Sequence, residues 1–175
     1  SKCIHFSGTS NTDPGTANSG ITITGNNIFD YFSATVASAG IDLNSGTVGT
    51  TISNNKFYQT ATRTQTTGSQ HNAIRISNTS GNAYQITGNT IGFASSTGTG
   101  TYTFVGVTSS SVFIPIFLSV GTTTASSVQG NTIAGINFSG PISGTSSSAS
   151  FRGIYVSSGL TSIGDVTGNT IGSMS

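Results

Sequence analysis

The short sequence GNTIG occurs twice, at residues 88–92 and 168–172, and GNTIA occurs at residues 130–134. Two diverged copies, ITGNNI at residues 23–28 and ISNNKF at residues 52–57, share the same frame. That frame is an aliphatic residue, a polar residue, Gly or Asn, an Asn, any residue, and then Ile or Phe. The motif asparagines are Asn26, Asn55, Asn89, Asn131 and Asn169. A motif repeated along a whole chain is typical of repeat architectures, so it constrains the fold more than any other feature.

A second repeated element alternates with the first. Its frame is a small residue or proline, Ile, a free position, and an aliphatic or aromatic residue, as in GIDLNSG at residues 40–46. From its Ile to the next motif Asn the distance is 14 or 15 residues in four cases and 22 in the first. The return from Asn to the next Ile varies from 15 to 27 residues and is rich in Ser, Thr and Gly. We call the stretch from Ile to Asn the fixed arm and the stretch from Asn to the next Ile the variable arm. A repeat with one arm of nearly fixed length and one arm with insertions predicts a solenoid.

Apolar and polar residues alternate within the repeats, as in the ITIT of residues 21–24, which is the period of strands with one buried face. Only 5% of the residues are charged, and the abundant Gly, Ser, Thr and Asn disfavour helices. An apolar fraction of 33% and a net charge of +1 argue against a disordered chain. We therefore predict an all-β fold, a parallel β-helix of about four to five coils that forms a single segment over residues 1–175.

The repeat also predicts the core. One internal column is expected to contain Ile23, Ile52, Ile86, Val128 and Val166, and a second Ile28, Phe57, Ile91, Ile133 and Ile171. The third face is expected to contain the pairs Ile4/Phe6, Ile41/Leu43, Ile74/Ile76, Ile116/Leu118 and Ile154/Val156. Between the first two columns the chain must turn sharply, and the residues expected to adopt a left-handed conformation there are Gly25, Asn54, Gly88, Gly130 and Gly168. The motif asparagines Asn26, Asn55, Asn89, Asn131 and Asn169 are expected to form a structural ladder inside this turn.

The free position of the second element contains the best candidate for a ligand-facing surface. It is occupied in successive coils by His5, Asp42, Arg75, Phe117 and Tyr155, which we call the stripe. The alternative is an ordinary exposed strand face with one cross-rung ion pair. His71 and Arg63 precede Ile74 and are expected to be solvated loop residues.

The sequence contains no catalytic constellation. Carbohydrate-active sites need clustered carboxylates or Ca²⁺, but Asp13, Asp30, Asp42 and Asp165 do not share a slot in adjacent coils. Calcium-binding nonapeptides are missing, so neither a metal nor a cofactor is expected. The scattered Lys and Arg residues predict no nucleic-acid binding, and the longest apolar run, residues 112–120, is too short to insert into a membrane. The single Cys3 excludes an internal disulfide.

A regular array of hydroxyl groups offers ice binding as a less favoured alternative. The outward residues beside the first column are Thr22/Thr24, Thr51/Ser53, Gln85/Thr87, Ser127/Gln129 and Asp165/Thr167. Gln and Asp interrupt this array, and Thr is common on solvated strands. Binding specificity is expected in the variable segments that follow Asn55, Asn89 and Asn131, because insertions there leave the column intact.

The repeats resemble the family of right-handed parallel β-helices, and the GNTI turns are similar to those of repetitive secreted proteins, including surface adhesins of Bacteroidetes-type bacteria. The resemblance covers essentially the whole chain and implies a right-handed coil. Because this scaffold carries lyases, hydrolases, tailspikes and adhesins, it indicates fold better than function. We expect a non-enzymatic stalk, spacer or adhesive segment of a large secreted or cell-surface bacterial protein, cut from a longer solenoid. Its expected partners are surface glycans or other cell-surface components and neighbouring coils of the same chain. A polysaccharide lyase or glycoside hydrolase is the alternative.

Overall fold

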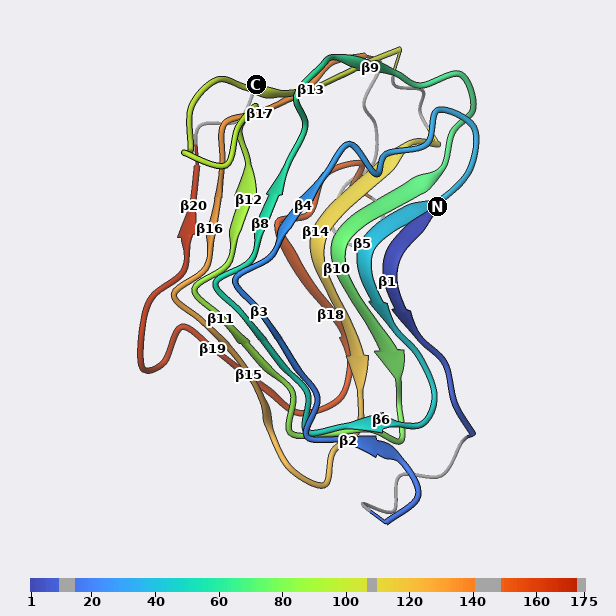
Figure 1. Cartoon of the computed structure of the whole chain (residues 1–175), viewed down its shortest axis with the longest axis vertical. Coiled ribbons are helices and arrows are strands. Elements are labelled where there is room, and N and C mark those ends of the chain that lie inside the picture. The colour runs from blue at the N-terminus through green and yellow to red at the C-terminus, as the bar shows by residue number, and fades with distance from the viewer. Residues whose placement is uncertain (10–14, 107–109, 141–148, 173–175) are drawn as a thin grey trace.

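The chain winds into a column of stacked β coils, as a computed structural model shows; it describes residues 1–9, 15–106, 110–140 and 149–172. The described residues contain strands and no helix, and every pair of neighbouring strands is parallel. In Figure 1 the chain runs down β1 (Lys2–Phe6) and crosses below. It then rises through β3 (Thr22–Thr24) and β4 (Asn27–Phe29) and returns to β5 (Ser38–Leu43) behind β1. This clockwise path recedes from the viewer, so the parallel β-helix is right-handed. The predicted fold class is confirmed.

Three five-stranded sheets form the sides of the column. The first contains β1 (Lys2–Phe6), β5 (Ser38–Leu43), β10 (Gln70–Asn78), β14 (Val112–Val120) and β18 (Ile154–Ser158). The second contains β3 (Thr22–Thr24), β7 (Thr51–Ser53), β11 (Gln85–Thr87), β15 (Ser126–Gln129) and β19 (Thr161–Ile163). The third contains β4 (Asn27–Phe29), β8 (Lys56–Tyr58), β12 (Thr90–Gly92), β16 (Thr132–Ala134) and β20 (Thr170–Ile171).

Two smaller sheets lie at the corners. One contains β2 (Asn18–Ser19) and β6 (Thr47–Val48), and the other β9 (Arg63–Thr64), β13 (Tyr102–Val105) and β17 (Ile136–Phe138). The second of these lies within the variable arm, which the sequence predicted only as loops. Tyr102 and Phe104 on β13 are buried and pack with Phe113 at ring distances of 5.7 and 5.1 Å. Burial of these aromatic side chains therefore extends the core into the variable arm, which was expected to contain only loops.

The inward residues of the second element are stacked as the repeat predicts. Ile41 pairs with Ile74 and Ile74 with Ile116, and all three side chains are fully buried. Gly40, the small residue before Ile41, has no room for a side chain. A Cβ on Gly40 would lie 2.8 Å from the Phe57 ring and 2.8 Å from the Ala73 carbonyl oxygen. The small residue therefore allows the column of Phe57 to pack close against the first sheet.

The last coil departs from the predicted register. Val128 pairs with Ile163, not with Val166, whose side chain is 86% exposed. Only residues 159–160 separate β18 from β19, whereas residues 121–125 separate β14 from β15. The strand therefore begins three residues early, and the stretch that leads from β19 to β20 is, counted between paired residues, three residues longer than its counterpart; we call residues 164–168 the additional segment. The total length of the arm is unchanged, so the constant spacing from Ile to Asn concealed the shift.

The backbone conformation of the corner glycine in the last coil also differs from the prediction. Gly25, Gly88 and Gly130 have φ angles of 70°, 64° and 61°, and Asn54 has 54°, as the tight turn requires. Gly168 is not in the left-handed region; Gly164, in the additional segment, has a φ of 64°. The segment bulges outside the outline of the other coils in Figure 1.

Candidate functional site

The first sheet aligns the five residues of the stripe. His5 pairs with Asp42, Asp42 with Arg75, Arg75 with Phe117, and Phe117 with Tyr155. Neighbouring rungs of a β-sheet are about 4.8 Å apart, so the stripe extends over roughly 19 Å parallel to the axis of the column. Charged groups occupy its N-terminal part and aromatic rings its C-terminal part.

Asp42 is the centre of the charged part. Its carboxylate is fully buried and accepts contacts from Lys2 Nζ at 2.6 Å, His5 Nδ1 at 3.0 Å and Arg75 Nη1 at 2.8 Å. Asn44 Nδ2 donates a further hydrogen bond at 3.0 Å. Burial raises the pKa of the Asp42 carboxyl, but hydrogen bonds from Lys2 and Arg75 and their charges outweigh it and hold the pKa below its ordinary value. Asp42 is therefore a fixed anion that organises surrounding cations.

The aromatic part combines rings with a second arginine. The Phe117 and Tyr155 rings lie 5.8 Å apart at an angle of 55°. The guanidinium of Arg75 lies 5.8 Å from the centre of the Phe117 ring, and that of Arg152 lies 4.6 Å from the centre of the Tyr155 ring. These distances are typical of cation–π interactions, so each ring interacts with one guanidinium group.

A surface hollow of about 380 Å³ adjoins the charged part of the stripe. Lys2, Asp42 and Arg75 line it together with the amides of Gln70 and Asn72. Gln70 Nε2 donates to Asn72 Oδ1 at 3.1 Å, and Asn72 Nδ2 donates to the Ile114 carbonyl at 2.7 Å. The hollow is thus lined by hydrogen-bonding groups whose neighbours fix their positions.

Sequence reasoning missed two of the cations beside the stripe. Lys2 and Arg152 each stand two residues before the Ile of the second element, at Ile4 and Ile154. This shared frame position was visible in the repeat alignment and could have identified both residues. With Arg75 they are three of the chain's five Lys and Arg residues, and Asp42 is the one acid beside them among the described residues.

The motif asparagines form a continuous hydrogen-bonded ladder in the turn. The side-chain oxygens of Asn55, Asn89, Asn131 and Asn169 each accept two bonds, one from the backbone N–H and one from the amide of the preceding motif Asn, at 2.9–3.1 Å. Their own amides donate to carbonyl groups of the coil before, at Ile23, Ile52, Ile86 and Val128. Because Asn55, Asn89 and Asn131 are also fully buried, the ladder is a structural element of the core.

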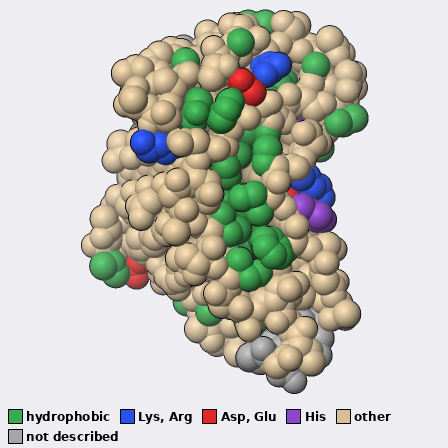
Figure 2. Space-filling model, viewed as in Figure 1, with side chains coloured by type: hydrophobic (Ala, Val, Ile, Leu, Met, Phe, Trp, Pro, Cys, Tyr) green, Lys and Arg blue, Asp and Glu red, His purple; other side chains and the backbone are tan. Residues whose placement is uncertain are grey.

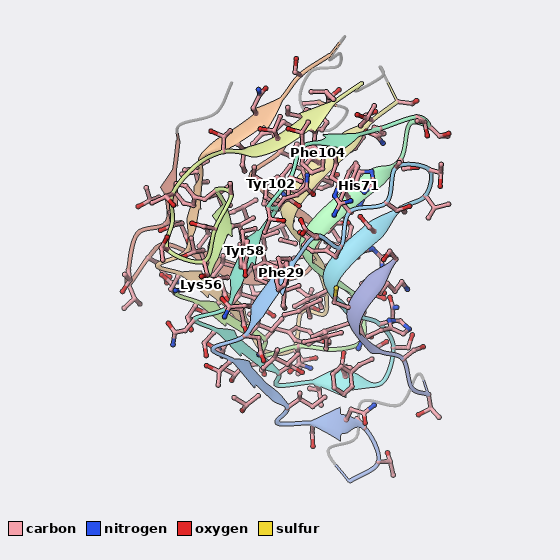
Figure 3. All side chains as sticks on the ribbon, turned by 45° about the horizontal axis from the view of Figure 1, so that its top comes forward. Phe29, Lys56, Tyr58, His71, Tyr102 and Phe104 are labelled. Atoms are coloured by element: carbon pink, nitrogen blue, oxygen red, sulfur yellow. The ribbon has the colours of Figure 1, made fainter. Side chains whose placement is uncertain are left out.

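His71 is not the solvated loop residue that the sequence predicted. It lies in β10, is buried, and its ring nitrogens are 2.7 Å from Ser38 Oγ and 3.1 Å from Gln65 Nε2. Figure 3 shows it beside Phe104, and the Phe32 ring lies 4.0 Å from it. Burial lowers the pKa of His71 from 6.5 to about 3, and the N-terminal charge adds to this shift. This neutral network is sealed from solvent, so it braces the core.

The predicted outward array keeps its register over four coils, although Gln85 interrupts its hydroxyl groups. Thr22, Thr51, Gln85 and Ser127 occupy successive rungs, and Ser53 Oγ donates to Thr24 Oγ1 at 3.0 Å. In the fifth coil Ser162 stands where Asp165 was expected. Asp165 and Thr167 lie in the additional segment, where both are held by the Gln129 side chain.

The described residues contain no group of three or more His, Cys, Asp or Glu side chains placed to hold a metal ion. In the same part of the chain no helix has the length and apolar character needed to cross a membrane. The fold and the stripe define a right-handed parallel β-solenoid with a charged and aromatic surface row. The chain matches no protein-family model, no curated protein and no solved structure at a significant level.

Proposed function

We propose that the chain is a non-enzymatic β-solenoid segment of a large secreted or cell-surface bacterial protein, and that it serves as a stalk or spacer with an adhesive surface. We further propose that the stripe binds glycans that carry carboxylate or sulfate groups. The observation that carries the proposal is the charge imbalance around Asp42. One buried carboxylate faces Lys2 and Arg75, and Arg152 adds a third cation beside Tyr155.

The arrangement of charges and rings suits an acidic glycan. Arg75 is about one-third exposed and Lys2 about half exposed, so both retain access to an anion while Asp42 holds them in place. The Phe117 and Tyr155 rings are partly exposed beside them and provide apolar surface for the C–H face of a sugar ring. Arginine is suited to carboxylate and sulfate groups because its donors form a planar fork.

The state of the carboxylates supports a passive role. Proton transfer near neutral pH needs a carboxyl group with a raised pKa or an accessible base, whereas the pKa of Asp42 is lowered and its oxygens are occupied. Asp30 accepts hydrogen bonds from the N–H and hydroxyl of Thr60 and contacts Arg63. Asp165 accepts a hydrogen bond from Gln129. These three acids lie apart from one another, and Asp13 lies outside the described residues.

Calorimetry with defined oligosaccharides tests this function. We expect oligogalacturonates or sulfated heparin fragments to bind more tightly than neutral dextran, with an affinity that falls as salt is added. Arg75→Gln and Phe117→Ala should each weaken binding about tenfold, a loss of about 1.4 kcal/mol. Arg63→Gln, which removes a cation of the variable arm, is the matched control and should bind as the wild type does.

The same samples distinguish the alternatives. New reducing ends or unsaturated products after long incubation would show a hydrolase or lyase and contradict the passive role. Equal binding of neutral and acidic glycans would contradict the role of the cations. Thermal hysteresis would indicate that the hydroxyl array of the second sheet binds ice.

A further inference from the structure

A single short side chain produces the hollow beside the stripe. Lys2, Ala39 and Asn72 pair on successive rungs of the first sheet, and all three line the hollow. Ala39 is buried and ends at its Cβ, whereas Lys2 and Asn72 on either side of it have longer side chains. The hollow is therefore a notch in the outward face of the sheet, with its centre on the second coil. Coils stacked on either end of the column would lengthen that face and leave the notch open.

We propose that this hollow binds one sugar residue that carries a carboxylate at the non-reducing end of a glycan. The proposal rests on the acidic-glycan binding proposed above, and it gives the end of the glycan chain a defined place beside the stripe. Glycans attached to a surface through their reducing ends expose the opposite ends to solvent. A terminal sugar is therefore the part that an adhesive segment meets first.

The charge around the hollow suits one acid group. Lys2 Nζ and Arg75 Nη1 contact the same carboxylate, at 2.6 and 2.8 Å, so the two cations lie close together where they line the hollow. With His5 uncharged, their two positive charges exceed the single negative charge of Asp42 by one. Figure 2 shows basic and histidine side chains together on the side of the column where β1 lies in Figure 1. A single carboxylate would therefore neutralise this cluster.

Arg75 has a free edge for that carboxylate. Its Nη1 donates to Asp42 Oδ1 at 2.8 Å and to Asn44 Oδ1 at 3.1 Å, while its Nε and Nη2 have no partner among the described residues. Nε and Nη2 form a planar pair of donors that can bind both oxygens of a carboxylate. Asp42 and Asn44 thus hold the guanidinium from one side and leave the bidentate side for a ligand.

The amides of the hollow provide neutral hydrogen-bonding groups for the hydroxyl groups of the same sugar. Gln70 Nε2 donates to Asn72 Oδ1 at 3.1 Å, which leaves Gln70 Oε1 as an acceptor without a donor among the described residues. Asn72 Nδ2 donates to the Ile114 carbonyl at 2.7 Å, which fixes the Asn72 amide. Two cations together with an oriented amide acceptor suit an acidic sugar better than a simple anion.

The size of the hollow favours a chain end. Ligand pockets typically measure about 300–1,000 Å³, and the hollow measures about 380 Å³, which suits one sugar ring. An interior sugar is linked on two opposite sides and would need two exits from the notch, whereas a terminal sugar needs one. The stripe provides this exit, because Phe117 follows Arg75 on the next rung and offers apolar surface to the second sugar.

Two trisaccharide isomers test the proposal. Each contains one glucuronate and two glucose residues, with the glucuronate either at the non-reducing end or in the middle. In NMR titrations of the isotopically labelled 175-residue chain, the terminal isomer should shift the amide signals of Ala39 and Asn72 and bind roughly tenfold more tightly. Equal affinities, or binding of oligogalacturonates alone, would overturn this inference and leave the proposed function standing. Failure of all three ligands to bind would overturn both.

Filling the notch provides the second test. Ala39→Gln places a long side chain in the hollow and should weaken binding of the terminal isomer roughly tenfold. Ser77→Gln, on the outward face of β10 beyond Arg75, is the matched control and should bind as the wild type does.

Lys2→Gln is the second variant in case Ala39→Gln does not fold. It removes a half-exposed cation without adding volume, so it should weaken the terminal isomer by about fivefold. Circular dichroism and the melting temperature check that the coils form in each variant. Folded variants at positions 2 and 39 that bind the terminal isomer as tightly as the wild type would contradict the assignment of the hollow.

Discussion

The side-chain oxygen of Asn89 accepts two hydrogen bonds from Asn55, one from the backbone N–H at 3.0 Å and one from Nδ2 at 3.1 Å. The amide of Asn89 in turn donates to the Ile52 carbonyl at 2.9 Å and to Asn131 Oδ1 at 2.9 Å. One buried side chain therefore satisfies groups of the coils on both sides of it. This exchange ties the corners of successive coils together.

Replacement of Asn89 by leucine should break the ladder in its middle. It leaves the buried N–H of Asn55 and the Ile52 carbonyl without their partners, and each such loss costs about 1–3 kcal/mol. We expect Asn89→Leu to lower the free energy of unfolding by about 3 kcal/mol or more, measured by chemical denaturation. Asn26→Leu at the exposed end of the ladder is the control and should cost less than half as much. Equal effects of the two variants would contradict the role of the ladder.

The two GNTIG copies should respond differently to alanine. Gly88 has a φ of 64°, and a Cβ there would lie 2.6 Å from Asn54 Oδ1, whereas Gly168 has an ordinary φ and open space around it. A left-handed conformation costs an L-residue roughly 1–2 kcal/mol. Gly88→Ala should therefore lower the melting temperature clearly and Gly168→Ala should leave it nearly unchanged. Equal effects would contradict the register of the last coil.

Asp42 should make the free energy of unfolding depend on pH in the acidic range. Burial raises the pKa of Asp42, but the hydrogen bonds and charges of Lys2 and Arg75 lower it by more than burial raises it. The pKa in the folded protein therefore lies below the ordinary value of 3.8. The stabilisation is therefore complete above about pH 4 and is lost as the pH falls through the folded pKa. Asp42→Asn should cost on the order of 1–2 kcal/mol at pH 7, because the charged partners are partly solvated. The difference from the wild type, measured by denaturation at several pH values, should shrink below pH 4; a constant difference would contradict the ion-pair assignment.

His71 should contribute over a different pH range. Its pKa falls from 6.5 to about 3 on folding, mainly because it is buried. Between these values the unfolded chain binds a proton that the folded chain does not, so stability should decrease as the pH falls from about 6.5. His71→Gln retains hydrogen-bonding groups for Ser38 and Gln65 without titrating, so its denaturation midpoint should vary less with pH over this range. An identical pH dependence in both proteins would show that His71 is accessible to protons in the folded state.

The sequence by itself determined the architecture, because each coil solves the same local problem with the same residues. Turn residues recur where the backbone must bend, and alternation places Ile41, Ile74 and Ile116 on one inward column. The sequence also placed the five residues of the stripe on one row, because the constant length of the fixed arm keeps equivalent positions in register.

Only the tertiary structure decided features that depend on contacts between coils. Two compensating changes of length moved Ile163 into the place of Val166, and no spacing between motifs could reveal them. The burial of His71 depends on Phe32 and Phe104, which come from separate variable segments. The state of Asp42 likewise depends on Lys2 and Arg75 in the coils on either side, because a carboxylate acquires its pKa from the charges and burial that folding brings to it.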